Sequence, residues 1–533
     1  MRPVCCHLGS EPRLGSAGSC DHHVWGRAQR TSSGVTRLTA AARSVHAYWV
    51  RPLPAERCSI PHRRYSLAVL HGCGDTGRVK LIDDGILPEE VFTHPRHESA
   101  QRSLAELIMQ LRACANVKDG YEFQQELLGH VLEVENDRNA FSRAAKRMRS
   151  GKPPQPGAPE PRSGLDPARP ETWRLEHDVC ERVARQYRCV GDALAWRVFG
   201  FQRRHIIALC QNESAGVMAG KAGLAAELER VEQAWKEDGQ FAILHDLTNC
   251  LRIGDVTVFG NDGSFETIEI KSDAERRRSA QRRRIKAAEE ALRDGRPLPG
   301  KDRKARLYDL DLPFKTQLDL LRTGTERAAK EGIFAARVRG ERALLVTDFY
   351  GCNAQGWTDD EFGHQLGRQF SAARRRAGLG TDREWNVSAT SLDSVSRDPQ
   401  RVPFAAYPLH PAACARLIGD LAVFTVETSG PALADSLSDA GLDADWIRAP
   451  GAGELTAGEV VMELHASASR PAFGNLRMEL TRTLQMRRSA LDHYLIEMVE
   501  QGTWIEGMRY MLADFDMEGR PWPTYRGEDQ VWV

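Results

Sequence analysis

Two acids and a lysine lie on neighbouring strand-like runs within residues 252–273, which read RIGDVTVFGNDGSFETIEIKSD. Asp255 is on the first run, and Glu269 and Lys271 are on the second. Carboxylates held side by side repel one another, and a divalent cation such as Mg²⁺, which prefers oxygen ligands, removes that repulsion. This chemistry is available only if the register of the two runs brings both acids to one face.

The loop Asn-Asp-Gly at 261–263 predicts that register. It suits a three-residue hairpin turn that ends in a glycine of left-handed conformation. Counting outward places Asp255 opposite Glu269, with their Cβ atoms roughly 4.5–5.5 Å apart, through the pairs Gly260–Ser264, Phe259–Phe265 and Thr257–Thr267. Lys271 follows on the same face. The opposite face is apolar and fit for a core, with Val256, Val258, Ile268 and Ile270.

The acid-x-Lys tripeptide carries no weight by itself. With 73 acids and 12 Lys in 533 residues, chance predicts about 1.6 copies, and the chain has two, Glu269-x-Lys271 and Asp302-x-Lys304. A lysine is still unusual here, because Arg supplies the other 61 of the 73 basic residues. A compact ammonium can shift its pKa beside a reacting water, whereas Arg stays protonated.

The elements predicted around the hairpin follow the order helix, three strands, two helices and a strand. The first helix, 222–238, has one apolar stripe of Leu224, Leu228, Val231 and Trp235. It is followed by strands at 241–246, 252–259 and 265–271, helices near 274–294 and 312–331, and a strand at 341–350. This order indicates an α/β domain of about 180 residues.

Asp255 on one strand and Glu269-Ile270-Lys271 on the next, after an amphipathic helix and a first strand, resemble the core of the PD-(D/E)XK nuclease superfamily. The resemblance covers residues 224–273 and, more loosely, the segment to 350. It implies a restriction-endonuclease-like αβββαβ fold and Mg²⁺-dependent hydrolysis of phosphodiester bonds, with Mn²⁺ as a substitute metal. Gly254, rather than Pro, precedes Asp255, and the next helix has no Q-x-x-x-Y, which argues against the exonuclease-like branch.

The resemblance also implies residue roles. Asp255 and Glu269 would ligate the metal together with the Ile270 backbone carbonyl, and Lys271 would orient or activate the attacking water. Some members of the superfamily carry a further Glu on the first helix. Glu227 borders the apolar stripe and is the best candidate for it, while Glu229, Glu232 or none of them are the alternatives. We expect His245, which ends the first strand, to be a hydrogen-bonded structural histidine rather than a ligand.

A basic segment follows the hairpin. Residues 271–306 contain 14 basic and 6 acidic residues in a chain whose formal net charge is zero. The predicted helix begins with six arginines that could neutralise phosphates, namely Arg276, Arg277, Arg278, Arg282, Arg283 and Arg284. A solvated helix face with no partner is the alternative. The expected partner is nucleic acid, DNA before RNA, and a homodimer or a defence or repair complex is a further possibility.

The whole chain predicts several regions. We expect a disordered or non-authentic extension at 1–60, a hairpin plus helices at 61–150, a Pro-rich linker at 151–172, the nuclease-like α/β domain at 173–350 and a C-terminal α/β domain at 351–533. The composition suggests a bacterial source, although residues 1–60 also resemble an organellar transit peptide in composition. The 12 cysteines form no C-x-x-C pair and no Cys/His zinc spacing, and such scattered thiols indicate a reducing cytoplasm. No apolar run long enough to span a membrane occurs.

Three interpretations of this sequence remain open. The first is a DNA endonuclease acting in restriction, repair or phage defence. The second is a catalytically inactive nucleic-acid-binding or scaffolding protein with a nuclease-like fold. In the third, the hairpin is an ordinary amphipathic element without chemistry. An intact set of metal-binding acids separates the first from the second, because a degenerate site has lost an acid or the lysine.

Overall fold

A computed structural model describes ten segments of the chain, which are residues 8–9, 94–210, 215–260, 263–270, 275–294, 315–379, 386–391, 401–447, 459–473 and 476–513. The hairpin predicted within the region 61–150, at residues 65–86, lies outside them, as does Lys271. Of the extension predicted at 1–60, only β1 (Leu8–Gly9) is described, and it pairs with β11 (Leu476–Arg487).

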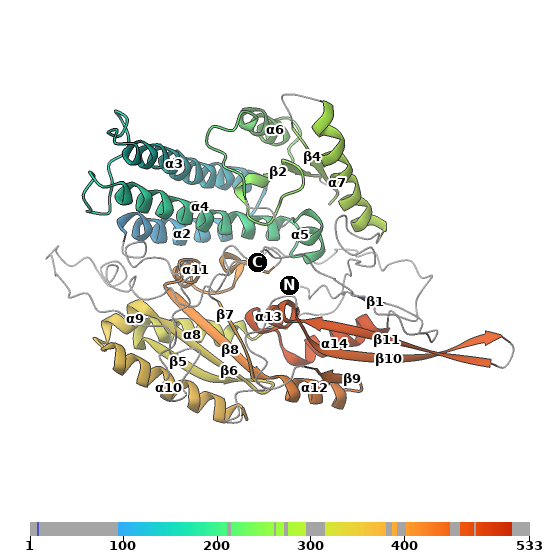
Figure 1. Ribbon diagram of the computed structural model, residues 1–533. Helices are drawn as coiled ribbons and strands as arrows, with labels where there is room; N and C mark the ends of the chain where they lie inside the picture. Colours follow the sequence, from blue (N-terminus) through green and yellow to red (C-terminus); the bar gives the residue numbers. More distant parts are fainter. Residues whose placement is uncertain are drawn as a thin grey trace.

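Three long helices form one layer of the molecule (Figure 1). They are α2 (Pro95–Ala113), α3 (Val117–Arg149) and α4 (Pro170–Val198). The segment 151–172, predicted to separate two domains, instead connects α3 and α4, which pack against each other along their length. Glu176 of α4 fastens this segment by accepting the backbone N–H groups of Arg162 at 2.6 Å and Ser163 at 2.8 Å.

A small antiparallel sheet adjoins the helical layer. Its strand order is β2 (Phe241–Leu244), β3 (Val256–Phe259) and β4 (Phe265–Ile268). The helix α6 (Leu224–Lys236) precedes the sheet, and the basic helix α7 (Glu275–Asp294) follows it. The chain order here is αβββα, and the predicted mixture of helices and strands is confirmed for this part of the chain.

The strand predicted at 341–350 does not complete this unit. It forms β6 (Arg342–Asp348) in a different four-stranded antiparallel sheet, together with β5 (Ile333–Val338), β8 (Ala422–Ser429) and β7 (Asn386–Thr390) in the order β5-β6-β8-β7. The prediction was wrong because an apolar run shows that a strand is buried but not which strand it pairs with. This sheet also crosses the domain boundary predicted at residue 350.

Two helices cover opposite faces of the larger sheet. Alternate residues of β6 face different clusters: Leu344 and Val346 join the core that contains α8 (Leu318–Glu331). Leu345 instead packs with Phe362 and Leu366 of α10 (Asp359–Arg376). Because successive strand side chains point to opposite faces, α8 and α10 lie on opposite sides of the sheet. The intervening helix α9 (Phe349–Ala354) begins directly after β6.

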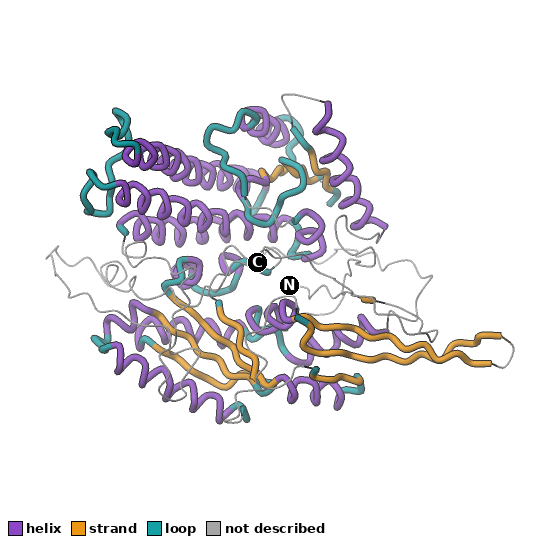
Figure 2. The backbone as a smooth tube through the Cα atoms, in the orientation of Figure 1, coloured by secondary structure: helices purple, strands orange, loops and turns teal. Residues whose placement is uncertain are grey.

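The C-terminal part contains a long two-stranded ribbon that extends from the body of the molecule (Figures 1 and 2). The ribbon consists of β10 (Val460–Phe473) and β11, and β9 (Asp443–Trp446) pairs with its base. The sequence of residues 476–500 predicts a helix, but its first half forms β11 and only α13 (Arg488–Ile496) is helical there. The remaining described helices of this part are α11 (Pro411–Ile418), α12 (Gly430–Asp439) and α14 (Gln501–Ala513).

One continuous apolar core joins these parts. It contains side chains from the helical layer, the small sheet and one face of the larger sheet. A buried ion pair reinforces the junction: Arg203 of α5 (Arg203–Leu209) donates to Glu497 at 2.5 and 2.7 Å. No helix in the described ranges is both long and apolar enough to cross a membrane.

Candidate active site

The hairpin register predicted from the turn is confirmed as far as the last ladder pair. Phe259 pairs with Phe265, and the ladder ends where Val256 pairs with Ile268. At the turn, the Gly260 N–H donates to the Ser264 carbonyl at 2.8 Å, and Gly263 has φ +80°, as the three-residue loop requires.

Asp255 and Glu269 each lie one residue beyond this ladder, so they do not form a further strand pair. The Asp255 N–H donates to the Ile268 carbonyl at 2.9 Å, and the Ile270 N–H donates to Asp255 Oδ2 at 2.7 Å. The Asp255 carboxylate is thus fixed across the end of β4. Glu269, which follows β4, is half-buried, and Lys271 lies outside the described residues.

Gly254 gives the chain the turn that delivers Asp255 to this position. Its φ is +81°, a conformation that L-residues rarely adopt. A Cβ atom at this position would lie 2.4 Å from Thr267 Cγ2 and 3.2 Å from the Ile268 carbonyl oxygen. This backbone therefore requires glycine at position 254.

The first helix brings Glu227 to the same end of the sheet. Its side chain is 1% exposed, whereas Glu229 is exposed and Glu232 pairs with Lys236 on the outer side of α6. Of the three glutamates considered on this helix, Glu227 is the one that lies on the buried side. Its Oε2 atom has no hydrogen-bond partner among the described residues.

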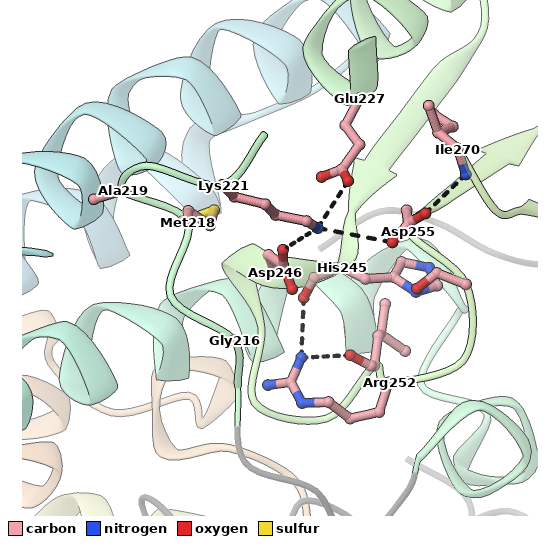
Figure 3. Close-up of polar contacts among 12 residues, drawn as sticks. Gly216, Met218, Ala219, Lys221, Glu227, His245, Asp246, Arg252, Asp255 and Ile270 are labelled. Atoms are coloured by element: carbon pink, nitrogen blue, oxygen red, sulfur yellow. Dashed lines mark hydrogen bonds and ion pairs between the residues drawn. The ribbon is translucent and has the colours of Figure 1, made fainter. Parts of the chain in front are cut away.

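Two further residues complete the group, and sequence reasoning assigned a role to neither. Lys221 lies in the loop before α6, and Asp246 lies just beyond β2. The Lys221 Nζ is 2.6 Å from Asp246 Oδ2, 2.7 Å from Glu227 Oε1 and 3.7 Å from Asp255 Oδ1 (Figure 3). The rarity of lysine in this chain, which singled out Lys271, was a signal for Lys221 as well.

The electrostatics of this group are dominated by the three carboxylates. Burial acts to lower the pKa of Lys221, but contacts with Asp246 and Glu227 outweigh it and raise the pKa, so Lys221 is an ammonium at neutral pH. Burial raises the pKa of Glu227, and the neighbouring Lys221 opposes that shift. With all groups ionised, three negative charges surround one positive charge.

A buried ion pair of the helical layer fastens both loops that carry the new residues. Arg188 of α4 pairs with Glu135 of α3 and donates to the carbonyl oxygens of Asp246 at 2.9 Å and Gly216 at 2.8 Å. Glu135 Oε2 in turn accepts the backbone N–H groups of Met218 at 2.7 Å and Ala219 at 2.9 Å. The backbone on the N-terminal side of Lys221 is therefore held in place.

His245 supports the hairpin from inside. It is 1% exposed, and its two ring nitrogens lie 2.7 Å from Thr257 Oγ1 and 3.1 Å from the Gly254 carbonyl oxygen. Burial, with a smaller effect of Arg252, lowers its pKa to about 3. Both nitrogens are engaged within the protein, so the structural role predicted for His245 fits this geometry better than metal ligation.

The basic helix lies beside β4. The side chains of Arg282, Arg283 and Arg284 are exposed. For Arg276, Arg277 and Arg278 the structure describes the helical backbone but not the side chains. Burial, followed by repulsion from Glu266 of β4, raises the pKa of Glu289. The inner side of α7 packs with the core through Ala288 and Ala291.

The opposite end of the hairpin contributes to an aromatic cavity of about 720 Å³. The Phe199 ring stands edge-on to those of Phe259 and Phe265, at 5.0 and 5.3 Å between centroids. The acids thus lie at one end of β3 and β4, and the cavity lies at the turn end.

A second group of potential metal ligands lies on α4. His177, Asp178 and Glu181 are half-buried and are the only described trio whose ligand atoms all lie within 4.8 Å of one another. They occupy about one turn of a single helix. The carboxylates around Lys221 are spaced more widely than this, because the ammonium stands between them.

No family model, curated protein or solved structure matches this chain.

Proposed function

We propose that this chain is a divalent-metal-dependent endonuclease that hydrolyses phosphodiester bonds of DNA. The observation that carries the proposal is the convergence of Glu227, Asp246 and Asp255 at one end of the small sheet. Oxygen ligands of this kind suit Mg²⁺ or Mn²⁺. The buried Glu227 Oε2, which lacks a hydrogen-bond partner among the described residues, supplies a further unused ligand atom.

The αβββα order from α6 to α7 supports a nuclease-like arrangement of this unit. Its helix contributes Glu227, the start of β3 contributes Asp255, and Glu269 follows β4. The larger part of the chain, including the sheet that contains β6, would be an addition to this unit. Substrate selection and assembly are the roles we propose for it.

Each residue has a role in this proposal. Asp255, Glu227 and Glu269 would hold the metal, with the Ile270 carbonyl as a further ligand. A bound Mg²⁺ would polarise the phosphate and lower the pKa of the attacking water. Lys271 would orient that water, and the exposed arginines of α7 would hold the DNA backbone through its phosphates.

The test uses the full chain with supercoiled plasmid DNA, with and without Mg²⁺, beside Asp255→Asn and Glu227→Gln. Glu232→Gln is the matched control, because it removes an acid from the outer side of the same helix. We expect metal-dependent nicking by the wild type and the control, reduced at least about 100-fold in the two site variants. If the wild type leaves plasmid, single-stranded DNA and RNA intact with either Mg²⁺ or Mn²⁺, the proposed activity is wrong.

One observation favours the alternative, a catalytically inactive nucleic-acid-binding protein. Lys221 already neutralises part of the charge of the acidic group, as an ion pair of a purely structural site would do. Retained DNA binding by the exposed arginines of α7, without cleavage of any substrate, identifies this alternative.

A further inference from the structure

The ammonium of Lys221 stands where a metal ion would have to stand. Its contacts with Asp246 and Glu227, at 2.6 and 2.7 Å, are close to the 2.3–2.6 Å that separates Ca²⁺ from its oxygen ligands. Asp255 is farther away, at 3.7 Å, and would have to approach by more than 1 Å to ligate the same ion. The three acids and Lys221 thus define one cation position.

This position is accessible from one side. The side chain of Lys221 is 30% exposed, and those of Asp246 and Asp255 are 19% and 22% exposed, whereas Glu227 is 1% exposed at the base. Lys221 can therefore leave toward solvent by rotation of its own side chain. Its backbone need not move, and the contacts of Glu135 and Arg188 hold the preceding residues.

We infer that Lys221 is the resident cation of this site and that a divalent metal binds by displacing it, with Asp246 as an additional ligand. The inference rests on the proposed function, since it concerns the metal site named there. The Coulomb attraction of a divalent ion to the three carboxylates is about twice that of an ammonium at the same position, and this difference favours displacement. Lys221 consequently sets the metal concentration at which the site fills.

The competing explanation is a permanent ion-pair cluster that merely stabilises the fold. The two explanations differ in what removal of the ammonium does. In a permanent cluster, Lys221→Met leaves repelling carboxylates and weakens the fold, without any gain of metal affinity. In a displaceable site, the same change frees the position, so metal affinity rises and the bound metal restores stability.

The experiment measures Mn²⁺ binding to the full chain by titration calorimetry, and thermal unfolding with and without Mn²⁺, in the absence of nucleic acid. Lys236→Met is the control, because Lys236 pairs with a single exposed carboxylate on the same helix. We expect Lys221→Met to bind Mn²⁺ at least about tenfold more tightly than the wild type, and the control to match the wild type. Adding Glu227→Gln to Lys221→Met should remove the gain.

Equal or weaker Mn²⁺ binding by Lys221→Met overturns the inference. If that variant is unfolded without metal, recovery of its fold in millimolar Ca²⁺ or Mn²⁺ supports displacement, and failure to recover contradicts it. Because no substrate is present, the result is separate from the nuclease test. A chain that cleaves nothing can still exchange Lys221 for Mn²⁺, and an active nuclease can fail to do so.

Discussion

Arg188 and Glu135 form a buried ion pair between α4 and α3 that fastens the two loops carrying Lys221 and Asp246. Arg188 reaches Asp246 only through its backbone carbonyl oxygen, at 2.9 Å, and its ion pair is with Glu135. The side chains of Arg188 and Glu135 bind backbone groups of both loops. The geometry of the candidate site therefore depends on α3 and α4, two helices that come earlier in the chain.

Arg188→Met should destabilise the chain by about 3–5 kcal/mol, because it leaves the buried Glu135 carboxylate without its partner. Urea denaturation followed by circular dichroism measures this. Arg174→Met is a suitable control, since Arg174 lies on the same helix but is largely exposed. A loss for Arg188→Met no larger than that of the control would show that the pair is not structural.

Gly254→Ala should destabilise the hairpin by about 2–4 kcal/mol, through both its positive φ and the clash with Thr267. Gly239→Ala separates the two causes. Gly239 has φ +63°, but a Cβ there would meet nothing within 4 Å. We expect this control to lose only about 1–2 kcal/mol. Equal losses for both variants in urea denaturation would contradict the close packing assigned to Gly254.

Acid should weaken the fold through His245. Its pKa is about 3 in the folded chain against an ordinary value of 6.5, so the unfolded chain binds the proton more readily. The stability it contributes is complete above about pH 6.5 and is lost as the pH falls toward 3, by up to about 1.4 kcal/mol per pH unit. Urea denaturation from pH 7.5 to 4.5 tests this. His245→Gln should show a shallower pH dependence, and an unchanged slope would contradict the assignment.

Replacing Arg282, Arg283 and Arg284 with Gln should weaken DNA binding similarly for all sequences. Each lost phosphate contact should reduce the slope of log affinity against log salt by about 0.9. Fluorescence anisotropy with a labelled duplex between 50 and 200 mM salt measures both quantities. Arg322, Arg327 and Arg339 are exposed on the larger-sheet side of the chain, and replacing them is the control. Equal effects of the two triple substitutions on DNA affinity would show that α7 is not the DNA-binding surface.

Local patterns predicted the hairpin and its register, since a three-residue turn and a period of two residues leave few alternatives. The apolar stripe of α6 also pointed correctly to Glu227 as the acid on the buried side. Lys221 and Asp246 could not be assigned in this way. Both lie in loops whose position is determined by Arg188 and Glu135, and no local pattern encodes a contact with a distant helix.

The errors in the fold have the same origin. Residues 476–487 are rich in Leu, Arg and Met, which favour helices, yet they form β11 because β10 pairs with them along the whole ribbon. Residues 342–348 are a strand as predicted, but their partners β5 and β8 place them in the larger sheet. Long-range packing determines which strands pair, and the sequence of one strand alone does not identify its partner.

The most direct test of the proposed cation site is an anomalous diffraction experiment on crystals of the full chain soaked in Mn²⁺. The account predicts a peak within about 2.2 Å of carboxylate oxygens of Glu227 and Asp255, with the Lys221 ammonium moved away toward solvent. A peak only at His177, Asp178 and Glu181, or no peak with Lys221 still between the carboxylates, would contradict it.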